Sequence, residues 1–385
     1  MSESVLDAVV ILLVGSVIAV AVFRHLGFPS ILAYLLVGLI TGPHGLVWIP
    51  HTEETHFLAE FGVVFLLFSI GLEFSIARLA AMKREVLGLG GAQVVVTTLL
   101  AGSIAWLLGL RFEAAFVIGG VLAMSSTAIV VKQLKDQQEL GLPHGRLSIA
   151  ILLFQDIAVV PFLIVIPVMA ESPDASLVWE LVWALSKGLS VIALMLTVGW
   201  WLLRPLFGII VTLKSSELFT LTALLFAMAS AWLSHYVGLS FAMGAFLAGM
   251  ILGETEFRQQ IEADIRPFRD VLLGLFFVTI GMMLDIHLLP VTVHWVLVLV
   301  VAIIVIKMAV IAGLSLLFGS PVGVGIRTGV VLAQGGEFGL ALLMVAFADG
   351  LLEKDIVQIV LAAVIITMAL TPILISHSGG HAKAP

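Results

Sequence analysis

An acidic side chain lies near the middle of an apolar stretch that is about one bilayer long. Asp156 stands in the run LLFQDIAVVP at residues 152–161, where the sequence offers no neighbouring charge to neutralise it. An ionisable group is expensive in hydrocarbon, so inside a membrane segment it usually marks an ion or proton pathway. The alternative is a carboxyl group that stays protonated and only joins helices by hydrogen bonds. We interpret Asp156 as the group that carries out the chemistry, by binding an ion or a proton.

Two other apolar segments contain sequences that disfavour a continuous helix. One reads LAMSSTAI at residues 122–129, and the other reads QGGEFG at residues 334–339. Hydroxyl groups compete for backbone hydrogen bonds, and glycine has a poor helix propensity, so we predict two broken helices whose ends line a polar cavity. Taken singly, the hydroxyls could bond back to the preceding turn and the glycines could mark a close helix crossing. The residues concerned are Ser125, Ser126, Thr127, Gly335 and Gly336.

Two further charges lie deep in apolar segments. Lys307 is far from both ends of its segment, too far for its ammonium group to reach the interface comfortably. It therefore needs a carboxylate, the C-terminal end of a helix, or neutrality. Glu337 lies inside the second predicted break, where it either satisfies amides at a helix end or faces the cavity. We interpret both as charge-compensating residues.

The composition identifies the elements that must position these side chains. The chain has 385 residues, 61% of them hydrophobic and 11% charged, whereas a soluble domain has about 25% charged residues. Thirteen apolar runs, each on the order of 20 residues long, predict an all-α polytopic membrane protein with thirteen transmembrane helices. The absence of cysteine excludes disulfides, thiol catalysis and cysteine-ligated metals.

The basic residues between the predicted spans indicate the orientation of the chain. Thirteen of them lie in connections after odd-numbered spans, whereas only Arg111 and Lys354 follow even-numbered spans. Cytoplasmic connections of membrane proteins carry the excess of Lys and Arg. The amino terminus is therefore predicted outside the cell and the carboxyl terminus in the cytoplasm.

The two halves of the chain resemble each other after a shift of about 210 residues. The shift places Gly38 on Gly249, and the run that ends at Gly71 on the run that ends at Gly281. The offset corresponds to seven spans, an odd number, so the halves would cross the membrane in opposite directions, as in the inverted repeats of secondary transporters. Chance similarity between helices rich in Gly and Leu is the alternative. The same shift brings the two predicted breaks into register, which favours a true repeat.

Four motifs together resemble the monovalent cation:proton antiporter-2 (CPA2) family, and specifically its Kef-type glutathione-regulated potassium efflux members. They are IGLE at 70–73, MSSTA at 124–128, FQD at 154–156 and QGGEF at 334–338, and the resemblance covers essentially the whole chain. Gln155 before the aspartate is typical of Kef-type proteins. The resemblance implies an inverted-repeat fold like that of Na+/H+ antiporters, with two broken crossing helices. It also implies a homodimer in the inner or plasma membrane that exchanges cytoplasmic K+ for external H+ by alternating access.

On this interpretation K+ and the proton compete for Asp156, because the carboxylate must ionise to hold the cation. Neutral oxygens around the cation would come from nearby carbonyls and from a set of polar side chains. Lys307 would balance helix-end charge, or pair with Asp156 when the cation is absent, and Glu337 would add to this compensation. The polar side chains expected around the cation are Gln155, Ser125, Ser126 and Thr127.

The resemblance also divides the chain into domains. A dimerisation domain, a core ion-transport domain, a linker helix and a tail are expected. The dimerisation domain comprises residues 1–85 and 215–289, and the core ion-transport domain comprises residues 86–172 and 290–377. The linker helix comprises residues 173–214, and the tail comprises residues 378–385.

A segment at 254–267 resembles the cytoplasmic regulatory loop of Kef-type proteins, with Glu262, Asp264 and Arg266 among its charged residues. The chain departs from the Kef pattern at 259–261 and at Arg266, which weakens the case for glutathione-dependent control. No Rossmann glycine fingerprint is present, so a nucleotide such as AMP or NAD(H), or glutathione, would act only through an appended or separate cytoplasmic domain. The chain itself is expected to need no cofactor and no nucleic acid. Its expected partners are the lipid bilayer and a second copy of itself.

Other functions stay open at this point. A Na+/H+ antiporter could use the same scaffold, because neither the fold nor the aspartate sets the ion. A ligand-gated K+ efflux channel would show flux that is independent of a proton gradient, and a sensor would bind a solute without moving it. An intramembrane hydrolase is disfavoured, because the chain has no G-x-S-x-G, paired-aspartate or H-E-x-x-H motif. The protein is therefore not expected to be an enzyme.

Overall fold

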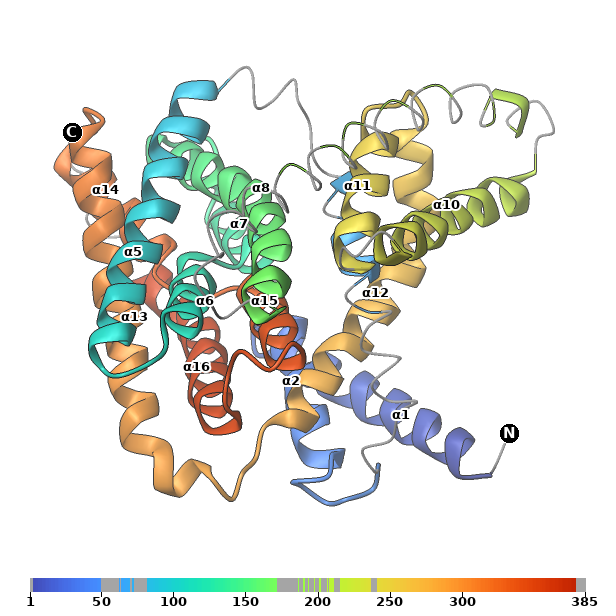
Figure 1. The fold of residues 1–385 in the computed structure, drawn as a ribbon, viewed down its shortest axis with the longest axis horizontal. Helices are drawn as coiled ribbons and strands as arrows, with labels where there is room; N and C mark the ends of the chain where they lie inside the picture. Colours follow the sequence, from blue (N-terminus) through green and yellow to red (C-terminus); the bar gives the residue numbers. More distant parts are fainter. Residues whose placement is uncertain are drawn as a thin grey trace. The chain divides into compact units, whose positions relative to one another are not determined.

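The computed structural model describes residues 3–49, 62, 64–69, 71–72, 82–171, 215–236 and 241–378, and isolated residues between 186 and 210. Every regular element in this part of the chain is a helix (Figure 1), which confirms the predicted all-α class. The predicted third span at 57–76, the linker at 173–214 and the tail at 378–385 lie largely outside the described residues.

The described residues form the following helices, in chain order. They are α1 (Glu3–His25), α2 (Ser30–Thr41), the π-helical segment η1 (Arg84–Gly90), α5 (Gly91–Leu107), α6 (Phe112–Ala123), α7 (Thr127–Asp136), α8 (Pro143–Glu171), α10 (Ser216–Tyr236), α11 (Phe241–Gly253), α12 (Arg258–Met283), α13 (Leu289–Leu317), α14 (Val322–Val331), α15 (Glu337–Ala348) and α16 (Lys354–Ser378).

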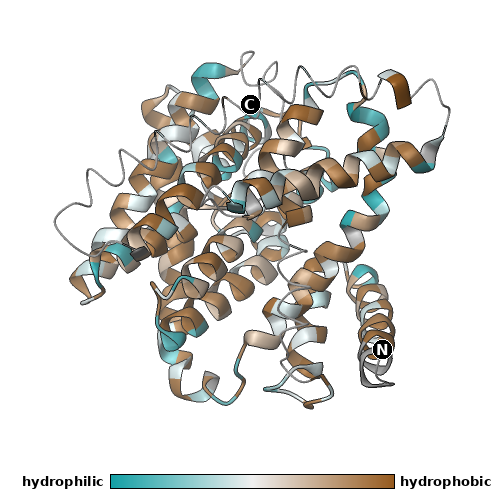
Figure 2. Cartoon of the chain, turned by 45° about the vertical axis from the view of Figure 1, so that its right-hand side comes forward, coloured by the Kyte–Doolittle hydropathy of each residue, from teal (hydrophilic) through white to brown (hydrophobic). Residues whose placement is uncertain are grey.

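Hydrophobic residues make up most of the length of these helices, and hydrophilic residues gather near helix ends and connections (Figure 2). Among the described residues, six helical segments are long and apolar enough to cross a membrane. They are Arg84–Leu107, Phe112–Asp136, Pro143–Ala170, Glu217–Tyr236, Pro290–Leu317 and Lys354–Ser376. Shorter apolar helices account for further predicted spans. This pattern is that of a multi-pass membrane protein, while the total of thirteen spans stays a prediction.

The chain divides into two compact units. The first unit comprises Met1–Val22, Ala33–Arg78 and Leu163–Met283, and the second comprises Phe23–Leu32, Leu79–Phe162 and Leu284–Pro385. Each unit therefore takes segments from both halves of the sequence. All residues discussed below as the candidate site belong to the second unit.

Two close helix crossings in the first unit are related by the shift that relates the sequence halves. A Cβ atom on Gly38 of α2 would collide with the carbonyl oxygen of Val278 on α12, and one on Gly249 of α11 would collide with that of Phe68. The shift of about 210 residues converts one of these pairs into the other. Glycine is required at such positions because only the absence of a side chain lets the two backbones meet.

The second unit contains a matching pair of helical hairpins. In the hairpin of α5 and α6, Gly119 lies against the backbone of Thr98. In the hairpin of α13 and α14, Gly329 lies against the backbone of Met308, in the same relation. Both residues of the second pair follow those of the first by 210 positions, so the repeat extends to the packing of this unit.

Two helical stretches of the second unit are interrupted within apolar sequence. Helix α6 ends at Ala123 and α7 begins at Thr127, while α14 ends at Val331 and α15 begins at Glu337. The backbone is extended at Met124 (φ −76°, ψ 145°), and Gly336 before α15 is extended as well. Each interruption leaves backbone N–H and C=O groups without intrahelical partners, which other groups must satisfy.

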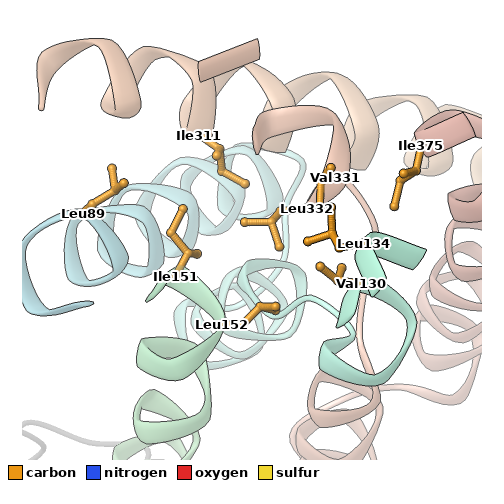
Figure 3. Packing of buried hydrophobic residues seen from close by; sticks show 9 residues of the cluster. All are labelled: Leu89, Val130, Leu134, Ile151, Leu152, Ile311, Val331, Leu332 and Ile375. Carbon is orange, nitrogen blue, oxygen red and sulfur yellow. The ribbon is translucent and has the colours of Figure 1, made fainter. Parts of the chain in front are cut away.

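A cluster of buried apolar side chains packs the helices around these interruptions (Figure 3). Ile151 on α8 is fully buried in it, one helical turn before Gln155. The cluster therefore fixes the face of α8 that carries Gln155. Its members are Leu89, Val130, Leu134, Ile151, Leu152, Ile311, Val331, Leu332 and Ile375.

The segment expected to be a regulatory loop is largely helical. Helix α12 begins at Arg258, so only the first residues of 254–267 connect it to α11. Ile261 and Ile265, one helical turn apart, are fully buried or nearly so. This spacing gives the charged segment an apolar face, which explains why it continues the helix.

Arg327 on α14 joins separate parts of the second unit. Its guanidinium donates hydrogen bonds to the carbonyl oxygen of Ile375 on α16 (2.6 Å) and to Glu139 Oε2 in the α7–α8 connection (2.7 Å). Glu139 Oε2 also lies 3.0 Å from His144 Nε2 at the start of α8. We call Arg327, Glu139 and His144 the Arg327 clasp. It brings together two segments that charge placement predicts on the same side of the membrane.

Protonation of Glu139 should weaken the Arg327 clasp. Burial raises the pKa of this carboxyl, but hydrogen bonds and charges from Arg327 and His144 together lower it more, so the pKa lies below its ordinary value of 4.5. Since the native pKa is the lower one, the stabilisation is fully present above the unfolded-state value and is lost as the pH falls through the native value. We expect Glu139→Gln to lower the free energy of unfolding by about 2 kcal/mol at neutral pH, and by progressively less below pH 4.5.

Thermal unfolding in detergent, followed from neutral to acid pH, measures this effect. The matched control is Glu113→Gln, because the partner of Glu113 is Arg111, whose side chain is 65% exposed, and exposed pairs contribute little. Parallel stability curves for the wild type and Glu139→Gln across the acid range would contradict the prediction.

Candidate ion-binding site

Asp156 and Gln155 are neighbours on α8 but face different surroundings. Gln155 is completely buried, whereas Asp156 is only partly buried. The hydroxyl of Thr127, the first residue of α7, donates to Asp156 Oδ1 at 3.4 Å. The carboxylate therefore lies beside the N-terminal end of α7, where positive partial charge favours an anion.

Side chains from other helices satisfy the backbone of the first interruption. The N–H of Ser125 donates to Gln155 Oε1 at 2.8 Å, and Lys307 Nζ donates to the carbonyl oxygen of Met124 at 2.6 Å. Ser126 Oγ accepts from the N–H of Ile129 at 3.3 Å and so caps α7. Polar groups that an unbroken helix would pair internally are thus held by side chains.

The second interruption is satisfied in a similar way. The carbonyl oxygen of Leu332 accepts from Ser125 Oγ at 3.0 Å, and that of Gln334 accepts from Lys307 Nζ at 2.6 Å. The N–H of Gly335 donates to Thr367 Oγ1 on α16 at 3.1 Å. Ser125 and Lys307 therefore take part in both interruptions.

Lys307 lies between equivalent points of the two interruptions. Met124 and Gln334, whose carbonyl oxygens it binds, are 210 residues apart and correspond in the repeat. Its ammonium group also donates to Ser125 Oγ at 2.9 Å, and the side chain is 1% exposed. It thus meets the C-terminal ends of α6 and α14, where helices carry negative partial charge.

Glu337 lies at N-terminal helix ends, whereas Lys307 lies at C-terminal ones. Glu337 is the first residue of α15 and is 5% exposed. Its Oε1 atom accepts from the N–H of Ala128 in the first turn of α7 at 3.4 Å. One carboxylate therefore meets the N-terminal ends of two helices, which complements the position of Lys307 at two C-terminal ends.

The two interruptions approach each other to backbone contact. A Cβ atom on Gly336 would collide with the backbone of Ser125 and Ser126. A side chain at this position would push the interruptions apart and break the bridge made by Lys307. This contact explains why the second interruption is rich in glycine, whereas hydroxyl side chains fill the first.

The chain matches a family model described as sodium/hydrogen exchanger, transmembrane, over residues 9–377. The chain belongs to this family. Its members are transporters by description, in agreement with the expectation that the protein is not an enzyme.

Curated relatives with high identity carry names that refer to K+ efflux. The chain is 47% identical over 362 residues to the "Putative K(+) efflux antiporter KefB" of Alkalimonas amylolytica, covering 94% of this chain and 55% of that protein. It is 42% identical over 375 residues to "K(+) efflux antiporter 1, chloroplastic" of Arabidopsis thaliana, covering 94% of this chain and 31% of that protein. The chain thus spans about half, or a third, of the length of these relatives. The resemblance to Kef-type members of the CPA2 family is confirmed.

Among solved structures, the fold is similar to that of the sodium proton antiporter MjNhaP1 from Methanocaldococcus jannaschii at pH 8. The TM-score is 0.73 at 19% identity, with 98% of this chain and 97% of that chain covered. At this identity the likeness concerns the fold alone. The predicted antiporter-like fold is confirmed at this level.

The second unit contains all the side chains that the sequence predicted as ion ligands or as charge-compensating residues. Within this group, Asp156 contacts Thr127, whereas Gln155, Ser125 and Ser126 direct the hydrogen bonds described above to the interruptions. The remaining members are Lys307 and Glu337.

The predicted regulatory residues belong to the other unit and lie on α12. Arg266 Nη2 is 3.6 Å from Glu262 Oε1, one helical turn away. Thr220 Oγ1 on α10 donates to Asp264 Oδ2 at 3.4 Å.

Sequence reasoning missed two polar residues that support the site, namely Gln93 on α5 and Thr367 on α16. Both are completely buried. A search for single polar residues within apolar runs would have found them, because such residues need a partner inside the protein. Which partner each one takes is a matter of tertiary packing.

Proposed function

We propose that the chain is the membrane part of an antiporter that exchanges cytoplasmic K+ for external H+. The observation that carries the proposal is the Asp156 carboxylate, held next to Thr127 at a helix end beside two interrupted helices. An ionised Asp156 binds the cation, and a protonated Asp156 does not. Because the two ligands exclude each other, moving the site between the two membrane faces exchanges one for the other.

The hydrogen bonds around the site suggest a division of roles. Asp156 and Thr127 contact the cation, together with carbonyl oxygens of the interruptions. Gln155, Ser125 and Ser126 hold the interruptions in shape, since their polar atoms bond to backbone groups there. Lys307 and Glu337 balance the charges of the helix ends. The K+ site is thus centred on Asp156.

The architecture of the whole transporter follows from the same proposal. Residues 86–172 with 290–377 act as the moving core, and residues 1–85 with 215–289 act as the dimerisation domain of a homodimer. Residues 173–214 link the two. The thirteen predicted spans include two broken helices that cross. The amino terminus lies on the outer side of the plasma or inner membrane, and the carboxyl terminus lies in the cytoplasm. Alternating access moves Asp156 between the two faces.

K+ is proposed as the cation because the names of the relatives refer to K+ efflux and because Gln155 precedes the aspartate. Na+ is the second candidate, favoured by the family description and by the structural neighbour. A gated K+ channel differs from both, since its flux needs no proton gradient.

Cation-dependent proton flux in proteoliposomes tests the proposal. Addition of K+ or Rb+ should release protons from the opposite compartment to the side of addition, and faster than Na+ or Li+ does. With a single carboxylate as carrier, exchange should be one-for-one and electrically silent on a solid-supported membrane. K+ flux without proton movement would replace the antiporter by a channel, and a preference for Na+ would replace K+ as the substrate.

The start of α12 is proposed to restrain transport at rest, through Glu262 and Asp264. Any nucleotide or glutathione would act on it through a cytoplasmic domain outside this chain. Neutralising both carboxylates should raise basal K+ loss from cells without changing the ion preference. Glu256→Gln, which neutralises an exposed carboxylate just before α12, is the matched control. Unchanged basal loss, with or without a downstream domain, would reduce the segment to a connector.

A further inference from the structure

Gln93 is a completely buried amide in the apolar helix α5. Its Oε1 atom accepts from Gln155 Nε2 at 2.8 Å. Its Nε2 atom donates to Thr97 Oγ1 at 3.1 Å and to the carbonyl oxygen of Ala123 at 3.2 Å. Gln93 thus connects α5, α8 and the end of α6.

The direction of these hydrogen bonds is fixed at both ends. The N–H of Ser125 can only donate, so Gln155 must present its oxygen there and its NH2 group to Gln93. Gln93 must then turn its oxygen to Gln155 and its own NH2 group to the carbonyl of Ala123, which can only accept. Two amides in series therefore connect the last carbonyl of α6, at Ala123, with the N–H of Ser125 inside the first interruption.

The backbone of this region brings the two amides within reach. Gly90 and Gly91 lie against the ring of Phe154 on α8, where a Cβ on Gly91 would be 3.4 Å from the ring. The π-helical segment η1 immediately precedes α5. Such wide turns often occur near functional sites, because they rotate the following residues to a new face. Gln93 lies in the first turn after it.

We propose that Gln93 is a positioning residue for cation exchange, which locks the Gln155 amide and thereby presents Asp156 and the first interruption in the geometry that binds the cation. The inference rests on the proposed antiport. It goes beyond that function because Gln93 acts through Gln155 and touches neither Asp156 nor Thr127 in these contacts. Since Gln155 and Asp156 are consecutive on α8, the bond to Gln93 fixes the rotation of the helix that carries both.

Two substitutions at Gln93 separate positioning from mere packing. Gln93→Leu removes all three hydrogen bonds of the side chain and should raise the apparent KM for K+ roughly tenfold, as expected when the buried Gln155 amide loses its partner. Gln93→Glu keeps the acceptor for Gln155, but its carboxylate cannot donate to the carbonyl of Ala123. Protonation restores the donor, so the activity of Gln93→Glu should recover at acid pH and its pH profile should shift to lower pH than that of the wild type.

The matched control is Thr98→Val on the same helix, because Thr98 Oγ1 is buried and has no hydrogen-bond partner among the described residues. A double-mutant cycle with Gln155→Leu adds a second measurement. If Gln93 acts through Gln155, the double variant should be no worse than the worse single variant, since the two residues work as one unit.

The outcomes decide between the two proposals. If the wild type shows no cation-dependent proton flux, the proposed function fails. If the wild type exchanges, the positioning role is overturned by Gln93 variants whose KM and pH profile match those of Thr98→Val, or by additive effects in the cycle. If Gln93→Leu does not fold, the pH profile of Gln93→Glu alone decides.

Discussion

The Asp156→Asn variant should show no cation-dependent proton flux above that of protein-free liposomes. An amide can neither carry the proton nor balance the charge of the cation, and the side chain lies at the centre of the proposed site. The variant should still fold, because the hydroxyl of Thr127 can donate to an amide oxygen as it does to Asp156 Oδ1. Flux is measured in proteoliposomes with a pH-sensitive dye.

A binding measurement separates loss of transport from loss of structure. A ligand that binds only the folded state raises the thermal midpoint, so K+ should stabilise the wild type and leave Asp156→Asn unaffected. Asp136→Asn is the matched control, because Asp136 is an exposed residue at the end of α7. Proton-coupled flux in Asp156→Asn at the wild-type rate would falsify the central role of this carboxylate.

The helix interruptions could be predicted from the sequence because their cause is local. Three consecutive hydroxyl residues in one apolar run, and paired glycines with a glutamate in the other, weaken a helix wherever they occur. The repeat of about 210 residues also follows from the sequence, since the glycines that permit the close crossings recur at this spacing. Gly38 with Val278 and Gly249 with Phe68 are examples.

The partners of the polar groups could not be predicted in the same way. Lys307 had three options by sequence, and its contact with the carbonyl oxygens of Met124 and Gln334 depends on how α13 packs between two interruptions. Gln155 was expected beside the cation, yet its amide bonds to Ser125 and Gln93. A neighbour in sequence can face another side of the helix, and packing decides which face meets the site.

The start of α12 was predicted as a loop but is helical, and the reason for this error is a different one. The resemblance marked 254–267 as a loop, and its many charges agree with a solvated connection. The apolar pair Ile261 and Ile265 has helical spacing, although Pro267 lies within the same helix, where proline is disfavoured. Tertiary burial of the two isoleucines outweighs the local preference.

The Lys307→Met variant should be less stable than the wild type by about 2 to 6 kcal/mol, because two buried carbonyl groups each lose a donor worth about 1 to 3 kcal/mol. Methionine fills a similar volume, so packing changes little. Removing a buried charge also removes its desolvation cost, which offsets part of the loss. We expect the loss of the donor to the two carbonyl groups to outweigh the recovered desolvation cost, because the oxygens of Met124 and Gln334 lie at helix ends that carry negative partial charge.

Thermal unfolding of Lys307→Met, Lys307→Gln and the control Ile303→Met measures this loss of stability. Ile303 is a buried apolar residue one helical turn before Lys307, and a volume-conserving exchange there should cost less than about 1.5 kcal/mol. Glutamine keeps a neutral donor and should fall between the wild type and Lys307→Met. If Lys307→Met were as stable as Ile303→Met, the ammonium group would not be holding the two interruptions together. The contact between Gly336 and Ser125, with the hydrogen bonds from Ser125 to Leu332 and from Ala128 to Glu337, would then have to hold the interruptions together.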